Sequence, residues 1–386
     1  MKHLPVNWID GMKINKSHFI AQDDAWKDAL HDMGALAVSP LKYGILPPSV
    51  DGENTFNVKI SLDNQGLLRV NVLSVQAVTL GGVRIQLPAA AAMGTDDLPA
   101  TSFQFQPAVG ESVYWIVLAV NPFERKPAGS PDLNETPPRF PGVVPVYEVQ
   151  VISDSQFRQF AANPYSLTIG KVNINGNDIR VDEDYIPPCF SVNAHADLLS
   201  LHAELDQRLG NIEQRVSQIV QKIYKKSQQN ELSELVLFLC DRVMLYLAPT
   251  ITDMRWMTPY ESPASLFAHV VSFARVMKNT IDLRTGTGKD EMMNYFTEWC
   301  ELKQGEFINM LSTISGFRFD NNDLNKDIRR IVVFINIISR LFETLSNLEF
   351  IGKRKESGIF VKEEQNYTQQ NESAGEQPKP RRRFFG

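Results

Sequence analysis

The hydrophobic pattern of the chain changes near residue 190. Before that point, residues 43–181 contain short runs in which apolar and polar positions alternate, which is the period of half-buried strands. One such run is formed by Phe56, Val58, Ile60 and Leu62. Gly81-Gly82 and Asn175-Gly176 each separate two runs, as expected of tight hairpin turns. Residues 113–120 are apolar on both faces and predict a central strand. We therefore expect an N-terminal antiparallel β-sandwich or barrel.

A proline-rich stretch interrupts this pattern between Asn121 and Gly142. It holds six prolines in 22 residues, a density that predicts a long exposed loop without strand or helix. Long loops of this kind are often interaction sites, although a tolerated insertion explains the composition equally well.

Residues 182–195, DEDYIPPCFSVNAH, separate the two patterns, and Pro187 and Pro188 force an extended backbone there. We expect a hinge between two domains. Apolar residues then recur at steps of three and four, at Leu198, Leu201, Leu205, Leu209, Ile212, Val216, Ile219 and Ile223. This stripe resembles a coiled-coil seam whose Ile-rich and Val-rich half favours three strands. A seam shared by three subunits and a stripe buried inside its own chain both remain open.

Four further helices are expected after this stripe. The first spans 231–248 and is ended by Pro249, and the second carries an apolar stripe over 266–277. The others span about 289–315 and 323–350. The fold class predicted is α+β multidomain, with an antiparallel β-sandwich domain followed by an α-helical bundle and a disordered tail. The expected domain limits are 1–190, 191–351 and 352–386.

A short helix is predicted near the N-terminus, from Ser17 as N-cap to Met33, ending at Gly34. Its residues Phe19, Trp26 and Leu30 share one side, which we expect to pack on the sheet that follows. His18 has no histidine, cysteine or carboxylate in a recognisable catalytic relation to it, so a chemical role is not expected.

The last 35 residues, 352–386, are too polar to bury a core, which predicts disorder. They end in a basic and aromatic cluster, Arg381, Arg382, Arg383, Phe384 and Phe385. Such a cluster on a tether suits a short docking peptide, and a solubilising tail without a partner is the equal alternative.

Composition narrows the cellular setting. The formal charge of −6 argues against nucleic acid as a partner, because phosphate binding needs a concentrated basic face. Cys189, Cys240 and Cys300 lie far apart, which fits neither a disulfide framework nor a zinc site and favours a reducing cytoplasm. The N-terminus lacks the apolar core of a signal peptide, and the later apolar runs are too short to span a bilayer. We expect a soluble cytoplasmic protein which, if it serves a membrane, does so by docking and without direct insertion.

The chain offers no recognisable catalytic, cofactor or metal site. Thr285–Asp290 suggests a phosphate-binding loop, but Leu283 stands where the first glycine is required and Asp290 follows the lysine. The sequence also lacks the GxSxG nucleophile elbow, the HExxH zinc-binding pair, the EF-hand calcium loop and the dinucleotide-binding fingerprint. Asp182, Glu183 and Asp184 beside Tyr185 suit a turn or an interface rim better than a cation site. We therefore expect no enzyme activity.

Two motifs carry a family resemblance. The first is formed by Trp8, Ile9, Asp10, Gly11 and Met12, then His18, Phe19, Gln22 and Asp23. The second is DEDYIPPC, residues 182–189, leading into a long helix. Together they resemble the TssK family, the baseplate subunit of type VI secretion systems.

The resemblance implies a homotrimer with a β-sandwich shoulder and a helical neck. The shoulder would bind the baseplate wedge formed by TssF and TssG, and a C-terminal head would contact the membrane complex. In this chain only the tail follows the fifth helix, so either the last two helices replace the head or the terminal peptide takes over docking. A compact version of this kind suits a divergent system such as the Bacteroidetes type.

The leading hypothesis is a non-enzymatic, cytoplasmic adaptor between the baseplate wedge and the membrane anchor. Trp8, Met12 and Phe19 would be apolar anchors of the wedge contact, or would pack under the sheet, and Asp10-Gly11 would shape the turn that presents them. The alternative is a receptor-binding or carbohydrate-binding trimeric β-sandwich protein of a phage-like particle. That alternative predicts exposed aromatic residues lining a groove.

Overall fold

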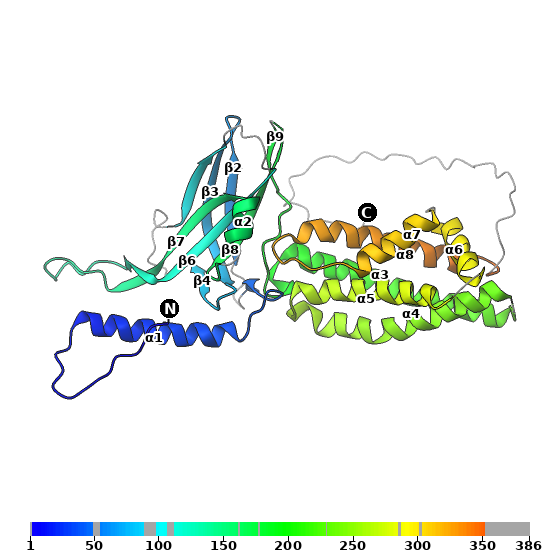
Figure 1. The fold of residues 1–386 in the computed structure, drawn as a ribbon, viewed down its shortest axis with the longest axis horizontal. Helices are drawn as coiled ribbons and strands as arrows, with labels where there is room; N and C mark the ends of the chain where they lie inside the picture. The colour runs from blue at the N-terminus through cyan, green and yellow to red at the C-terminus, as the bar shows by residue number, and fades with distance from the viewer. Residues whose placement is uncertain are drawn as a thin grey trace, which may run out of the picture. The chain divides into compact units, whose positions relative to one another are not determined.

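The computed structural model describes residues 2–48, 55–88, 98–105, 112–160, 163–176, 178–228, 230–284, 287–300 and 303–351 (Figure 1). It divides into two compact units. Unit 1 comprises Met1–His195, Tyr260–Ser265 and Phe319–Asp327, and unit 2 comprises the rest. The antiparallel sheets belong to unit 1 and the long helices after Ala196 to unit 2, so the α+β fold class is confirmed. The predicted tail, including Arg381–Phe385, lies outside the described residues.

The first sheet of unit 1 is built around one long strand. Its members are β1 (Gly44–Ile45), β2 (Phe56–Leu62), β3 (Leu67–Val78), β4 (Arg84–Leu87) and β5 (Ala100–Gln104). All four other strands pair antiparallel with β3, whose residues Leu68, Val70 and Val72 are fully buried. The predicted hairpin joins β3 to β4, and Gly82 adopts a φ of +76° in its turn.

The second sheet has the order β7-β6-β8-β9, formed by β6 (Val113–Ala128), β7 (Gly142–Ser153), β8 (Ser166–Asn175) and β9 (Asp178–Val181). β6 is an inner strand, as its two apolar faces predict. The sheets pack closely, because a Cβ atom on Gly170 of β8 would lie 2.7 Å from Ile60 Cδ1 of β2. The hairpin predicted at Asn175-Gly176 joins β8 to β9. The short helix α2 (Asp154–Phe160) follows β7.

The prediction of a structureless loop over 121–142 is wrong. β6 continues to Ala128 and β7 begins at Gly142, and the two strands pair from Arg125 opposite Pro145 to Ala128 opposite Gly142. A strand tolerates proline where its N–H would point away from the partner strand, and the register shifts between Asn121 and Arg125, around Pro122. The β6–β7 ribbon therefore projects from the sheet, and the connection after Ala128 joins its two strands.

The junction with two prolines packs into the sandwich and ends at the unit boundary, His195. Ile186, Pro187, Pro188 and Cys189 are all buried. The Ile45 N–H donates to the Pro188 carbonyl at 2.7 Å, and the Phe190 N–H donates to the Ile45 carbonyl at 2.9 Å. The extended backbone that the prolines impose thus pairs with β1.

Two short segments from the second half of the chain also belong to unit 1. In the segment 319–327, the Asn322 side-chain oxygen accepts hydrogen bonds from the hydroxyls of Tyr43, at 3.0 Å, and Thr168, at 3.1 Å. The Asn322 carbonyl accepts from the Tyr185 hydroxyl at 3.1 Å. Burial of Tyr43 raises the pKa of its phenol to about 12, so it remains a donor at neutral pH.

Ion pairs hold the same two segments. Lys171 Nζ lies 2.9 Å from a carboxylate oxygen of Asp323. In the segment 260–265, the Glu261 carboxylate lies 3.2 Å from Lys42 Nζ. The expected domain limits of 1–190 and 191–351 are therefore replaced by a boundary at His195 and two returning segments.

Unit 2 is a helical bundle. Its helices are α3 (Ala196–Lys225), α4 (Glu231–Trp256), α5 (Pro263–Asp282), α6 (Thr287–Cys300), α7 (Gln304–Ser315) and α8 (Leu324–Asn347), of which the first residues of α5 and α8 belong to unit 1. Pro249 does not end α4 as predicted, because the buried residues Ile251 and Met254 continue its apolar face. The predicted helix 289–315 is divided into α6 and α7.

The apolar stripe of α3 is internal to the chain. Leu198, Leu201, Leu205, Leu209, Ile212, Val216, Ile219 and Ile223 are each at most 2% exposed. α4 packs along α3 within unit 2 and helps to cover this stripe. The stripe is therefore the buried face of a bundle helix, and the interpretation of these eight residues as a trimer seam is wrong, because they offer no surface to another subunit.

α4 is long and apolar enough to cross a membrane by length and composition, although 44% of its most apolar window is buried in unit 2. The apolar run noted in the sequence is thus part of a much longer helix. Core helices of bundles have the same composition, so this is weak evidence for a membrane span.

Candidate interaction surface

The N-terminal helix α1 (Lys16–Ala35) begins at a capping box. Its N-cap is Asn15, two residues before the predicted Ser17, and the Asn15 side-chain oxygen accepts from the Ser17 N–H at 3.0 Å. In return, the Asn15 N–H donates to His18 Nδ1 at 3.3 Å. His18 therefore has a structural role at the start of the helix.

Arg125 of the β6–β7 ribbon attaches the middle of α1 to the sandwich. Its guanidinium lies 2.6 Å from Asp24 and 3.2 Å from Asp23, and it also donates to the Ile20 carbonyl at 3.3 Å. Asp24 is the buried residue of the helix. The hydrogen bond to Asp24 raises the pKa of Arg125 further, so the guanidinium keeps its charge.

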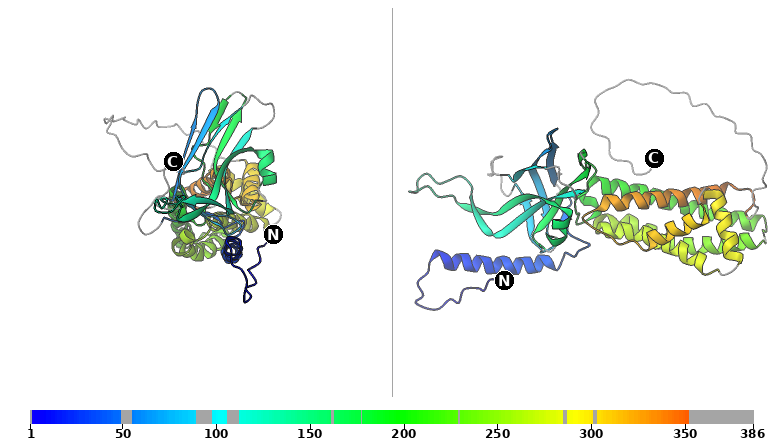
Figure 2. Two further views of the ribbon diagram at one scale, coloured as in Figure 1. Left: turned by 90° about the vertical axis from the view of Figure 1, so that its left-hand side faces the viewer. Right: turned by 45° about the horizontal axis from the view of Figure 1, so that its top comes forward.

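Aromatic and backbone contacts hold the C-terminal half of α1. The His31 ring centroid lies 5.9 Å from that of Phe123 and 6.4 Å from that of Tyr165. Burial lowers the pKa of His31, which favours the neutral imidazole. Gly34 contacts the β3–β4 turn so closely that a Cβ atom there would lie 2.5 Å from the Gly82 carbonyl oxygen. In both views α1 runs along the β6–β7 ribbon (Figures 1 and 2).

The opposite face of α1 is apolar and exposed. The exposed fractions are 58% for Phe19, 63% for Trp26, 64% for Leu30 and 69% for Met33. These residues follow one another at steps of seven, four and three, so they share one face, which we call the α1 face. The prediction that this face packs on the sheet is wrong, because the face with Asp24 and His31 takes that place.

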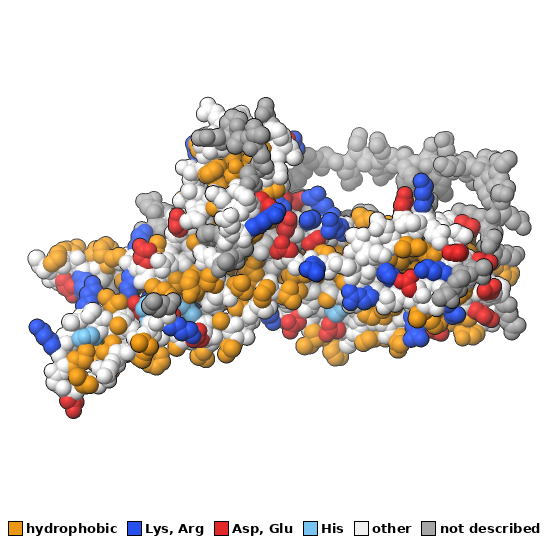
Figure 3. Space-filling model, viewed as in Figure 1, with side chains coloured by type: hydrophobic (Ala, Val, Ile, Leu, Met, Phe, Trp, Pro, Cys, Tyr) orange, Lys and Arg blue, Asp and Glu red, His pale blue; other side chains and the backbone are white. Residues whose placement is uncertain are grey.

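The arm formed by residues 2–15 turns back along α1. The Val6 N–H donates to the Gln22 side chain at 3.2 Å, and His3 Nδ1 lies 3.0 Å from the Asp28 carboxylate. Side chains of the arm add further exposed apolar area, from Leu4, Trp8, Ile9 and Ile14. Figure 3 shows hydrophobic side chains gathered along this part of unit 1.

The arm brings the predicted motif residues together. The Trp8 ring lies 6.1 Å from that of His18 and 6.4 Å from that of Phe19. Between them, the Met12 N–H donates to the Ile9 carbonyl at 3.2 Å across the Asp10-Gly11 turn, where Gly11 has a φ of +78°. Trp8, Asp10, Gly11, Met12, His18 and Phe19 thus belong to one surface, which we call the arm–α1 surface.

Three residues that hold this surface were not predicted from the sequence. Arg125 lies in the stretch that its prolines mark as a loop, and Asp24 and His31 lie in a helix whose apolar residues point elsewhere. A clue was available in the consecutive acidic residues Asp23 and Asp24, which need a cation if one of them is buried.

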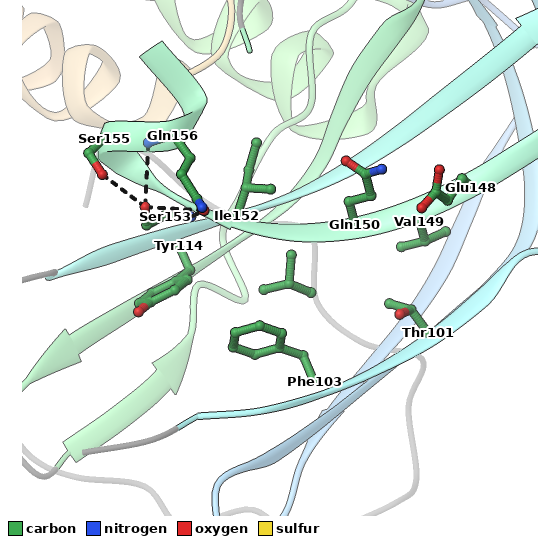
Figure 4. A pocket seen from close by; sticks show the side chains of 11 residues that line it. Thr101, Phe103, Tyr114, Glu148, Val149, Gln150, Ile152, Ser153, Ser155 and Gln156 are labelled. Atoms are coloured by element: carbon green, nitrogen blue, oxygen red, sulfur yellow. Dashed lines mark hydrogen bonds between the residues drawn. The ribbon is translucent and has the colours of Figure 1, made fainter. Parts of the chain in front are cut away.

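A second concave feature lies between β5 and β7 of unit 1. It has a volume of about 690 Å³ and is lined by Phe103 and Tyr114 together with polar side chains. In Figure 4, Thr101 and Phe103 come from β5 and stand across from Val149 and Gln150 of β7, while Ser153, Ser155 and Gln156 form a hydrogen-bonded group at one end. Among the described residues, no group of three or more His, Cys, Asp or Glu side chains could hold a metal ion.

Two cysteines and the lysine of the sequence that suggests a phosphate-binding loop have structural surroundings. Cys189 and Cys240 are buried thiols, and burial raises the pKa of Cys240 to about 12 and that of Cys189 further. Neither is a thiolate at neutral pH. Lys289 lies in α6 and pairs with Asp282 at 2.8 Å. The side chain of Cys300 lies outside the described residues.

Comparison with known proteins follows this geometry. Residues 153–278 match the family model described as "Bacterial Type VI secretion, VC_A0110, EvfL, ImpJ, VasE". No curated protein sequence matches the chain. The matched segment runs from the end of β7 through the DEDYIPPC junction to α5.

Solved structures similar to this chain are also type VI secretion proteins. A crystal structure of TssK has 14% identity and a TM-score of 0.45, with 89% of this chain and 69% of that chain covered. For a TssK-TssF-TssG baseplate subcomplex the sequence identity is 16% and the TM-score is 0.48, and the alignment covers 89% of this chain and 99% of that chain. For TssK from an EAEC type VI system, in complex with a nanobody, the sequence identity is 15% and the TM-score is 0.47. The alignment covers 84% of this chain and 68% of that chain.

The family match makes residues 153–278 of this chain similar to a type VI secretion family. The matched segment contains the motif at residues 182–189, which carries part of the resemblance to the TssK family.

Proposed function

We propose that this chain is the adaptor of a type VI secretion baseplate, which links the baseplate wedge to the membrane-anchoring complex and acts by binding alone. The arm–α1 surface carries this proposal. It presents Trp8, Phe19, Trp26, Leu30 and Met33 to solvent, each at least 48% exposed. Contiguous exposed apolar area of this kind marks an interaction site, and tryptophan often dominates binding at such sites.

The way this surface is held supports binding. Arg125, His31 and the contact between Gly34 and Gly82 attach α1 to the sandwich along its length. A partner therefore meets a surface that is already ordered, which lowers the entropic cost of association.

The wedge proteins, similar to TssF and TssG, are the partners that we assign to the arm–α1 surface. The family resemblance supports this assignment, together with a homotrimer located in the cytoplasm at the inner face of the membrane. Because the α3 stripe is internal, subunits of that trimer would meet through other residues. Neither nucleic acid nor direct membrane insertion has a place in this proposal.

For the contact with the membrane complex, we propose the terminal peptide Arg381–Phe385. Deletion of residues 375–386 should leave the fold unchanged and reduce recruitment of baseplates to the membrane in cells, as seen with a fluorescent baseplate subunit. Normal recruitment by the shortened chain would contradict this role.

Co-purification tests the adaptor function. The full chain, tagged and expressed with the TssF-like and TssG-like proteins of the same system, should retain both through size-exclusion chromatography. Recovery of the chain without either protein would contradict the proposal.

A second candidate function is recognition of a glycan or receptor, and the groove between β5 and β7 favours it. Phe103 and Tyr114 give this groove an aromatic wall, and Glu148, Gln150 and Gln156 add polar groups. A glycan array with the full chain tests this candidate, and a Phe103→Ala variant should lose any binding that the groove provides.

A further inference from the structure

A groove between α7 and α8 of unit 2 combines an apolar floor with two cationic side chains. It has a volume of about 330 Å³ and is lined by Met310, Thr313 and Ile314 of α7 and by Arg329, Arg330 and Val333 of α8. Val333 is 56% exposed, whereas most apolar side chains of α8, such as Ile331 and Ile335, are buried.

The charges lie at one end of the groove. Arg329 and Arg330 are exposed and precede Val333 by about one helical turn. A ligand that fits this arrangement has an apolar part for the floor and anionic groups for the arginines, in that order along α8 from its C-terminal side toward its N-terminal side.

The chain beyond Ile351 contains such a segment. Residues 352–386 are mostly polar, and Ile359-Phe360-Val361 is their longest run of large apolar residues. Lys362 follows it, and then the adjacent carboxylates Glu363 and Glu364. The order is apolar first and acidic second. The basic cluster at 381–383 does not fit the same groove, because it carries the same charge as the two arginines.

The chain leaves the described part of unit 2 from a fixed point. Ile351 is 1% exposed, its N–H donates to the Gln228 side chain at 2.9 Å, and its carbonyl accepts from Asn230 at 3.3 Å. Lys226 lies 3.2 Å from Glu349 and holds the preceding residues.

The length of chain beyond Ile351 suffices to reach the groove. Val333 precedes Asn347, the last residue of α8, by 14 residues, which is about 21 Å along the helix axis. Phe360 follows Ile351 by nine residues, and an extended segment of that length spans up to about 31 Å. Glu363 and Glu364 follow Phe360 by three and four residues, which is more than enough chain to span the one helical turn of about 5 Å from Val333 to Arg329 and Arg330.

We propose that residues 359–364 of this chain bind in the α7–α8 groove of the same molecule. Phe360 occupies the apolar floor beside Val333, and Glu363 and Glu364 pair with Arg329 and Arg330. Because the segment is tethered to the groove, its effective concentration is in the millimolar range, so modest contacts suffice to hold it. This inference is independent of the proposed baseplate function.

Site-specific photo-crosslinking in the full chain tests this inference. A benzophenone amino acid at position 333 should crosslink to residues 357–366, as mapped by mass spectrometry. The matched control carries the same group at Leu245 of α4, which is 71% exposed, and should give at least tenfold less crosslink to that segment. Mixing isotope-labelled and unlabelled chains should give crosslinks within one isotope only.

Charge exchange tests the orientation. Arg329→Glu with Arg330→Glu should lower the crosslink yield at least fivefold, and adding Glu363→Arg with Glu364→Arg should restore it. Circular dichroism confirms that each variant is folded. The inference is overturned if the crosslinks from position 333 match the Leu245 control, if they join two isotopes and so reveal a second copy in the groove, or if the charge exchange does not restore the yield.

Discussion

At the scale of single residues, Arg125 decides how α1 is attached to the sandwich. One guanidinium serves two carboxylates and a carbonyl of α1, and its own side chain is 20% exposed. Loss of this cation would leave Asp24 with only Lys27, at 3.7 Å, to balance its charge. Such an imbalance costs more than the loss of a surface pair.

We predict that Arg125→Ala lowers the free energy of unfolding of the sandwich by about 1–3 kcal/mol, because it removes hydrogen bonds to charged groups and leaves Asp24 poorly paired. Urea denaturation measures this change, and hydrogen exchange should locate it in α1. Arg139→Ala is the matched control, since the Arg139 pair with Glu135 lies in the exposed connection between β6 and β7. Equal effects of the two substitutions would contradict the attachment role.

The lowered pKa of His31 predicts that the attachment of α1 to the sandwich depends on pH. Burial lowers its pKa in the folded protein below the ordinary value of about 6.5, so the unfolded or detached state binds the proton more readily. The contribution of His31 is therefore complete above about pH 6.5 and is lost as the pH falls toward the folded pKa. Asp28 and Asp32 raise the pKa of His31 and Lys27 lowers it, but burial has the largest effect.

Hydrogen exchange of α1 amides, corrected for intrinsic rates, should be faster at pH 5.5 than at pH 7.5. His31→Gln, which does not titrate in this range, should remove most of the difference. An α1 that exchanges equally at both pH values in the unchanged protein would contradict the assignment.

At the scale of elements, local pattern was sufficient wherever local forces decide the structure. The α3 stripe, the central strand β6 and the two glycine hairpins were predictable because periodicity and turn chemistry specify them. Two predictions that relied on proline were wrong: Pro127 lies in a paired strand and not in a loop, and α4 continues past Pro249. In both cases long-range pairing or packing outweighs the local effect of proline, and a single sequence does not display such contacts.

The burial of the α3 stripe gives an element-scale prediction. Leu209→Ala should lower the free energy of unfolding of the bundle by about 2–5 kcal/mol, because Leu209 is fully buried. Since the stripe is internal, the urea midpoint of this variant should depend on protein concentration no more than that of the unchanged chain. Leu199→Ala on the same helix, at a side chain that is 40% exposed, is the control and should change little. A urea midpoint that shifts with protein concentration in the Leu209→Ala variant alone would support the interpretation of the stripe as a seam between subunits.

At the scale of the whole molecule, the sequence predicted an α+β chain with a boundary near residue 190 but missed the segments that return to unit 1. Asn322 shows why. Its partners Tyr43, Thr168 and Tyr185 lie far from it in the chain, and such polar pairs leave no periodic trace. The motif residues from Trp8 to Phe19 were predictable by resemblance, whereas the exposed α1 face required the structure.

The arm–α1 surface is the proposed binding site for the baseplate wedge. The affinity of the chain for the TssF-like and TssG-like proteins measures this role. Trp26→Ser combined with Leu30→Ser removes the middle of the α1 face at side chains that are 63% and 64% exposed, so the fold should persist. We predict that the dissociation constant for the wedge rises at least tenfold, equivalent to about 1.4 kcal/mol, while Leu245→Ser on α4 leaves it unchanged. A folded double variant that binds the wedge as tightly as the unchanged chain would contradict the account.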